Sequence, residues 1–477
     1  MKFPLSLVLL FCFTSFPLLS HSQSAEDTDG VSGTWKGTIE AFGEEIPLVF
    51  EIETIGKDRY KGSLISPKHS QEKIPLSSIK ITGRDVVIGI DYIQSSFSGK
   101  LSTRSGKIRG DWIHPQGEIP LELGFSAKPF EMDRPQNPGE KVSYSVKEVK
   151  IPNTSGDNVL SGTLTMPEKL TRPVPAVILL SDSGAHDRDG SANGHKPFLI
   201  LADFLTKNGI AVLRYDERGV EQSTGLYDFA NPTDFAIDAA TAFRFLKKQP
   251  NIDSNRIGLI GHGEGATHAA IVSSKREDVA FLVLLAAHGL KGGETILAKS
   301  ESLGRTAGLP DAFIQLNLQF SSALFDVLTG ETPDLEKAAK LGKKFEAEFK
   351  NTGDIDPAKL TSLAALIRMQ AERFDSPWLR KFVQLDPAFW LERTTVPVLS
   401  INAGNDLEIP GKKHIPAIEK SLKIAGHADS KVETVSGLNH LFQSSKTGLT
   451  EEYDTIAETF SPQVLKRIEE WILSLRL

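Results

Sequence analysis

Three positions in the chain have the residue types and order that acyl-transfer chemistry uses, except that one of them is a glycine. The segment Arg256–Ala270 begins with an apolar run, passes through the turn Gly261–Gly265 and continues as a small-residue helix. A serine at the centre of such a turn can attack a carbonyl carbon, and the central residue here is Gly263. Asp406 follows a late predicted strand, and His440 follows the last one. Their chain order is nucleophile position, acid, histidine.

The acid and the histidine are the half of a catalytic triad that moves a proton. His440 would take the proton of an attacking hydroxyl, while Asp406 would orient the imidazole. Gly263 offers no hydroxyl, and loss of the serine from such a triad has cost about 10⁶ in rate in a protease. Glycine also removes the strain of about 1–3 kcal/mol that this turn imposes on other residues. The sequence therefore predicts a preserved fold with a lost or impaired reaction.

The segment resembles the G-x-S-x-G nucleophile elbow of α/β-hydrolases with its serine absent. The stretch Ser181–Asp189 resembles the Gly-Ser-Gly-Pro-x-Asp-Arg-Asp loop of an exported bacterial family of carboxylesterases and acyl-aminopeptidase-like enzymes. The segments 195–199, 213–219 and 438–442 look like the same family. The resemblance covers about residues 142–477 and implies a hydrolase of carboxylic esters or acyl-peptides by lineage.

The resemblance also implies an oxyanion hole. The loop Ser183, Gly184 and Ala185 would supply one backbone N–H, and Glu264 would supply the other. Asp182 stands where the family usually has a small residue. A carboxylate turned inward there would oppose the charge of an oxyanion, whereas one turned outward would not. The sequence leaves both orientations open.

Two classes of function follow from the missing serine. In the first, some hydrolysis survives, because Ser181, Ser183 or a water activated by His440 and Asp406 makes the attack. In the second, the protein is a non-catalytic pseudoenzyme that holds a small ester, acyl or peptide ligand without cleaving it. If Gly263 is itself a sequencing error or an introduced substitution for a natural serine, the first class applies in full and the natural protein is an ordinary hydrolase.

The sequence predicts neither a cofactor nor a metal. Gly261–Ala266 fits the dinucleotide fingerprint G-x-G-x-x-A, but this motif opens the first βαβ unit and requires an acid after the next strand. Here at least two strands precede it, and the next strand ends in Ala286-Ala287-His288. The chain has no H-E-x-x-H or other zinc-binding spacing.

The elements that must position these residues form two predicted domains. From residue 142 to 477, strands alternate with helices, which predicts an α/β-hydrolase domain with a parallel sheet. A helical stretch at about 294–387 interrupts it where a lid would lie. Residues 31–126 contain eight short alternating runs, which predict a small antiparallel β-barrel-like domain. This domain resembles a lipocalin-like module, either with a ligand cavity or as a solid spacer, and residues 127–141 form a linker.

Composition limits location and partners. Residues 1–22 read as a signal peptide, with Lys2 ahead of an apolar run that is short for a membrane span. We therefore expect an exported protein, periplasmic or secreted, with no membrane span. The only cysteine, Cys12, lies in this peptide. The net charge of −7 and the lack of a basic block argue against a nucleic-acid partner. Nothing in the sequence fixes an oligomeric state.

Overall fold

The computed structural model describes residues 31–475, except 42, 69, 103–104, 127–133, 169, 330–333 and 351–375. The chain divides into two compact units. One ends at Arg134 and also includes Thr450–Ala457, and the other begins at Pro135 and contains the remainder of the C-terminal part. The predicted signal peptide lies outside the described residues, as do residues 127–133 of the predicted linker.

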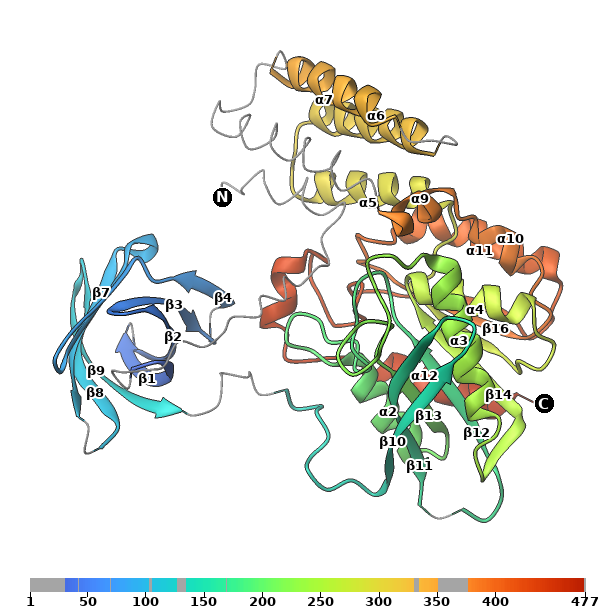
Figure 1. The fold of residues 1–477 in the computed structure, drawn as a ribbon, viewed down its shortest axis with the longest axis horizontal. Coiled ribbons are helices and arrows are strands. Elements are labelled where there is room, and N and C mark those ends of the chain that lie inside the picture. The colour runs from blue at the N-terminus through green and yellow to red at the C-terminus, as the bar shows by residue number, and fades with distance from the viewer. Residues whose placement is uncertain are drawn as a thin grey trace. The chain divides into compact units, whose positions relative to one another are not determined.

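The first unit is a nine-stranded antiparallel sheet curled into a half-barrel (Figure 1). The order of its strands is β4-β3-β2-β1-β9-β8-β7-β6-β5, so that β4 and β5 are its two edges. The strands are β1 (Gly33–Ala41), β2 (Glu44–Gly56), β3 (Arg59–Ser66), β4 (Ser70–Pro75), β5 (Ser78–Thr82), β6 (Asp85–Ile90), β7 (Ser95–Ser102), β8 (Lys107–His114) and β9 (Gly117–Ser126). The predicted small all-β domain is confirmed.

Alternating side chains fill the inside of this sheet. In β6 the pattern alternates between exposed and buried, as a sheet with one packed face requires. Phe50 lies at the centre of the core, with ring centroids 6.1 Å from Phe97 and 6.4 Å from Trp112. The sequence missed β4, because its residues, Ser-Gln-Glu-Lys-Ile-Pro, contain a single large apolar side chain and no alternation.

The second unit contains an eight-stranded mixed sheet of order β10-β11-β13-β12-β14-β15-β16-β17. Its strands are β10 (Tyr144–Asn153), β11 (Asn158–Pro167), β12 (Val174–Leu180), β13 (Ala211–Tyr215), β14 (Ile252–His262), β15 (Leu282–Leu285), β16 (Val398–Ala403) and β17 (Lys431–Val435). Strand β11 is antiparallel to both of its neighbours, and the strands from β13 to β17 are parallel. This is the α/β-hydrolase fold, and the predicted fold class is confirmed.

Helices cover both faces of this sheet. Helices α2 (Pro197–Lys207) and α12 (Pro462–Ser474) share one apolar core with the sheet. Helices α3 (Pro232–Leu246), α4 (Glu264–Ser274) and α11 (Gly411–Ala425) share the other core. The parallel strands are apolar on both sides for this reason, and β12 and β15 are almost entirely buried.

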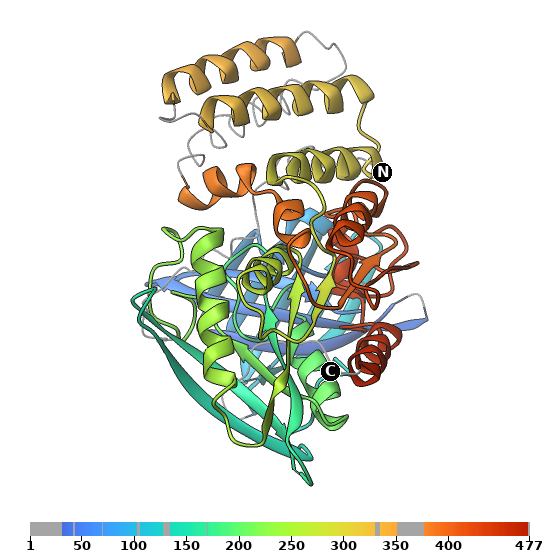
Figure 2. The same cartoon turned by 90° about the vertical axis from the view of Figure 1, so that its right-hand side faces the viewer.

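A helical insertion separates β15 from β16. Its described helices are α5 (Gly292–Thr306), α6 (Asp311–Leu328), α7 (Leu335–Lys350), α9 (Pro377–Gln384) and α10 (Pro387–Leu391). Figures 1 and 2 show α5, α6 and α7 stacked side by side, with a small apolar core of their own. The predicted helix at 360–374 lies outside the described residues. The role of the insertion as a lid stays a prediction.

No helix among the residues described is both long enough and apolar enough to cross a membrane.

Candidate active site

The turn between β14 and α4 has the backbone geometry of a sharp elbow. Gly263 has φ 52° and ψ −115°, a conformation that side chains disfavour. Its N–H donates to the carbonyl oxygen of Leu285 at 2.9 Å, which fixes the turn to β15. A β-carbon at Gly261 would overlap the backbone of Gly265, and one at Gly265 would overlap the carbonyl of Leu180. Glycine at both positions therefore lets α4 begin directly against the sheet.

Asp406 and His440 meet as predicted, at the carboxyl ends of β16 and β17. Nδ1 of His440 donates to Oδ2 of Asp406 at 2.8 Å, and both side chains are buried. Oδ1 of Asp406 accepts the backbone N–H groups of Glu408 and Ile409, each at 2.8 Å. The carboxylate is therefore held on both oxygens, and it orients the imidazole as the acid of a triad does.

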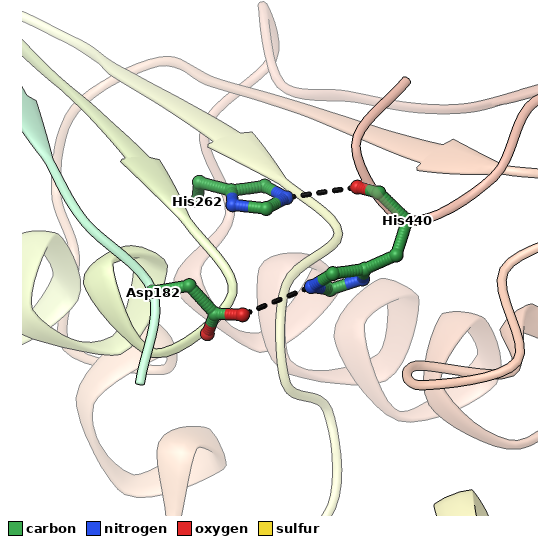
Figure 3. Close-up of side chains that lie close together, drawn as sticks. All are labelled: Asp182, His262 and His440. Atoms are coloured by element: carbon green, nitrogen blue, oxygen red, sulfur yellow. Dashed lines mark hydrogen bonds and ion pairs between the residues drawn. The ribbon is translucent and has the colours of Figure 1, made fainter. Parts of the chain in front are cut away.

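Asp182 points into the site, which decides between the two orientations that the sequence left open. The loop after β12 places its carboxylate between the elbow and the histidine. Oδ1 accepts the backbone N–H of Glu264 at 2.7 Å, and Oδ2 accepts from Nε2 of His440 at 2.9 Å (Figure 3). A β-carbon built on Gly263 would overlap Oδ1 and lie 2.7 Å from Oδ2. The carboxylate thus fills the volume that a serine side chain would need.

The ionisation of this pair follows from its neighbours. Burial opposes a charge on His440, but the carboxylates of Asp406, Glu408 and Asp182 raise its pKa well above the ordinary value. Burial also opposes a charge on Asp182, but the hydrogen bond from His440 lowers its pKa well below the ordinary value. The two groups form a partly buried ion pair in which both ring nitrogens of His440 act as donors.

Of the predicted oxyanion-hole groups, the Glu264 amide already has a partner within the protein. Its N–H donates to Oδ1 of Asp182 at 2.7 Å. The Ser183 hydroxyl donates to Oε2 of Glu264 at 2.8 Å, while the Nε2 proton of His440 goes to Asp182. Ala185, the third residue of the loop, is half-buried.

Glu264 joins the elbow to the helical insertion. Its buried carboxylate accepts Nε1 of Trp378, at 3.1 Å from Oε1 and 3.0 Å from Oε2. Trp378 lies on α9 and stacks on Phe382, with ring centroids 4.7 Å apart. The sequence did not predict this contact, because the two residues are 114 positions apart and neither belongs to a motif.

His262, which directly precedes Gly263, also contacts this site, and no sequence motif predicted its role. Its Nε2 donates to the backbone oxygen of His440 at 2.9 Å, and the two rings have centroids 4.6 Å apart. Burial lowers the pKa of His262, with a further contribution from charge on His440. The available signal was its position beside the elbow centre, at the carboxyl end of β14.

Comparisons with known proteins agree with this fold. Residues 240–338 match the family described as BAAT / Acyl-CoA thioester hydrolase C terminal. The chain is 27% identical over 384 residues to Esterase EstD of Thermotoga maritima, an alignment that covers 76% of this chain and 82% of the relative. The chain is therefore esterase-like in sequence as well as an α/β-hydrolase in fold.

Solved structures with a similar arrangement include an esterase of Pyrococcus furiosus, with 16% identity and a TM-score of 0.41, covering 69% of this chain and 91% of that one. Another is Est1E from Butyrivibrio proteoclasticus with bound ferulic acid, with 15% identity and a TM-score of 0.40, covering 68% of this chain and 98% of that one.

Proposed function

We propose that the protein descends from carboxylic ester or acyl-peptide hydrolases, has lost serine-type hydrolysis, and uses the site to bind a small ester, acyl or peptide ligand. One observation carries the proposal: the Asp182 carboxylate fills the space that a side chain at position 263 would need, and it also accepts the Glu264 amide. The similarity to Esterase EstD supports the lineage.

The rate costs of the missing groups favour a complete loss of hydrolysis over a weakened reaction. Removing a serine nucleophile costs about 10⁶ in rate, and removing one oxyanion-hole donor costs about 10²–10³. Here the nucleophile is absent at Gly263, and the Glu264 donor is spent on a carboxylate. An oxyanion that formed near Asp182 would also face its negative charge, which raises the barrier further.

Hydrolysis is tested with p-nitrophenyl acetate and butyrate, in the presence of a chelator. We expect the natural protein and the His440→Ala variant to give the same rate, close to that of buffer. Turnover that depends on His440 would contradict the proposal, and would point to water, Ser181 or Ser183 as the attacking group.

Binding is tested through the indole of Trp378, which contacts the elbow through Glu264. We expect ethyl butyrate or N-acetylalanine amide to change the tryptophan emission in a saturable manner. The Trp378→Phe variant, with the other four tryptophans intact, is the matched control and should not respond. Emission of the natural protein that neither probe changes would contradict the binding half of the proposal.

A further inference from the structure

We propose that Asp182, His262 and His440 form a binding site for a divalent transition-metal ion such as Zn²⁺. One ligand atom from each residue lies within 4.8 Å of the other two. Figure 3 shows the three side chains converging from three separate segments. Two imidazoles and one carboxylate are the donor set of many zinc sites that keep a further position for water.

The hydrogen bond that Nδ1 of His440 donates is typical of a metal-binding histidine. Such histidines donate their second ring N–H to a carboxylate or a backbone carbonyl, which fixes the tautomer and aims the other nitrogen at the metal. Nδ1 of His440 donates to Asp406 at 2.8 Å, and Asp406 is held by two backbone amides. Nε2 is then the ligand atom, and the ion takes the place of the proton that Nε2 shares with Asp182.

The ring of His262 is also oriented by a hydrogen bond, but through Nε2 instead of Nδ1. Its Nε2 donates to the backbone oxygen of His440 at 2.9 Å, which leaves the lone pair on Nδ1. In Figure 3 Nδ1 lies on the edge of the ring that faces Asp182. Asp182 in turn is oriented by the Glu264 amide on Oδ1, so that Oδ2, which now accepts from Nε2 of His440, is the oxygen that faces the ion. Each of the three residues therefore has an orienting bond and one atom left for the ion.

The required movements are small. Zn²⁺ binds nitrogen and oxygen at about 2.0–2.2 Å, so that tetrahedral ligand atoms stand about 3.3 Å apart. The Asp182–His440 contact of 2.9 Å would open by a few tenths of an ångström. The His262 nitrogen would move inward from a separation that does not exceed 4.8 Å. Side-chain rotations supply such shifts without a change in the backbone.

The local charge favours a cation. Four acidic side chains lie in or beside the cluster, namely Asp182, Asp406, Glu217 and Glu264. Burial raises the pKa of Glu217 well above its ordinary value, and the acidic groups around it raise it further. Glu217 therefore adds little negative charge, and a divalent ion would offset the charge of the two carboxylates that contact His440, those of Asp182 and Asp406.

Linear spacing could not reveal this site. The ligands follow β12, end β14 and follow β17, and only the parallel sheet brings these three ends together. The prediction of no metal rested on the lack of a local zinc motif, which such a site does not need. The metal site is a separate proposal from the loss of hydrolysis. Its test measures how many ions bind per chain, so the failure of one proposal leaves the other standing.

The first experiment uses the full chain after treatment with a chelator and its removal. Titration with Zn²⁺, followed by calorimetry and by metal analysis after gel filtration, should give one tightly bound ion per chain. His262→Ala, His440→Ala and Asp182→Ala should each weaken binding by more than about a hundredfold. Asp406→Asn, which removes only an orienting partner, should weaken it by about 10–100-fold.

His186→Ala is the matched control. Its ring lies beside the same loop, with Nε2 3.1 Å from the Ser183 oxygen, but it is not part of the cluster. This variant should bind Zn²⁺ as the natural protein does. Failure of the natural protein to retain Zn²⁺ would overturn the proposal, and so would retention that all three ligand variants leave unchanged.

A measurement on the natural protein covers the case in which a variant does not fold. Co²⁺ in a site of low coordination number gives intense visible absorption bands, whereas hydrated octahedral Co²⁺ gives weak ones. Intense bands that Zn²⁺ displaces stoichiometrically would support the site. A spectrum identical to that of Co²⁺ in buffer would overturn it.

Discussion

The acid–histidine half and the nucleophile half of the candidate site differ in how closely each matches the arrangement of a catalytic triad. In the acid–histidine half, Asp406 and His440 have the contacts that triad chemistry needs, supported by the backbone after β16. In the nucleophile half, glycine stands at the centre of the elbow, at position 263, and the Asp182 carboxylate fills the volume beside it and accepts the Glu264 amide. The two residues of the second half fit each other, because the glycine leaves room for the carboxylate and the carboxylate forms an ion pair with His440.

The largest expected effect comes from substituting Gly263 and Asp182 together. We expect Gly263→Ser combined with Asp182→Gly to hydrolyse p-nitrophenyl butyrate at least about 10³-fold faster than the natural protein, because the hydroxyl and the Glu264 amide become available together. Gly263→Ser alone should gain far less, since its β-carbon overlaps the Asp182 carboxylate. Steady-state rates compare the three proteins.

The control for this experiment adds His440→Ala to the double variant, which should remove the gain. If Gly263→Ser alone matched the double variant, Asp182 would be free to turn aside. The two changes would then not be coupled in the way we argue.

The next effect compares two glycines of the same elbow. A β-carbon at Gly265 meets the backbone carbonyl of Leu180, which cannot turn away, whereas one at Gly263 meets the side chain of Asp182. We expect Gly265→Ala to lower the free energy of unfolding by about 3 kcal/mol, and Gly263→Ala by about 1–2 kcal/mol. Urea unfolding gives both values.

Adding Asp182→Gly distinguishes the two glycines further. It should recover part of the cost of Gly263→Ala and none of the cost of Gly265→Ala. Equal recovery in both backgrounds would mean that Asp182 acts on the elbow as a whole.

His414 is a buried histidine outside the Asp182–His440 ion pair, and it should make the stability of the fold depend on pH. Burial lowers the pKa of His414 from 6.5 to about 4, and its Nδ1 accepts the Gly289 amide at 3.0 Å. Below pH 6.5 the unfolded chain protonates this group while the folded chain does not. Its contribution to stability is therefore complete above pH 6.5 and is lost as the pH falls towards about 4.

The His414→Asn variant keeps an acceptor for the Gly289 amide but has no group that titrates there. Its free energy of unfolding should fall between pH 7 and pH 5 by about 2 kcal/mol less than that of the natural protein. Unfolding curves at the two pH values measure the difference. The same loss in both proteins would show that other groups set the acid limit of the fold.

The sequence predicted those parts of the molecule that depend on local pattern. The alternation of strands and helices follows from periodicity, whereas the elbow and the chain order of Asp406 and His440 follow from the resemblance to α/β-hydrolases. The geometry of the acid–histidine half matches the prediction, because each residue lies in the loop that follows its own strand and the parallel sheet aligns the strand ends.

What the sequence did not predict depends on a side-chain direction or on distant partners. Asp182 could turn either way after β12, and its inward turn depends on the Glu264 amide and on His440, 82 and 258 residues away. Strand β4 was missed because pairing with β3 replaces the apolar alternation that it lacks. The role of His262 was missed because its partner is a backbone oxygen, which no residue pattern records.

The smallest effect concerns the link between the nucleophile half and the helical insertion. Trp378→Phe keeps a ring that can stack on Phe382 but removes the donor to the buried Glu264 carboxylate. Ser183 still donates to that carboxylate, so we expect a loss of about 1 kcal/mol, measured by urea unfolding. The matched control is Trp390→Phe on α10, whose ring instead faces Phe389 and the Lys275 ammonium. If the two variants lost the same stability, the cost would come from the smaller ring, and the insertion would not be tied to the elbow through Glu264.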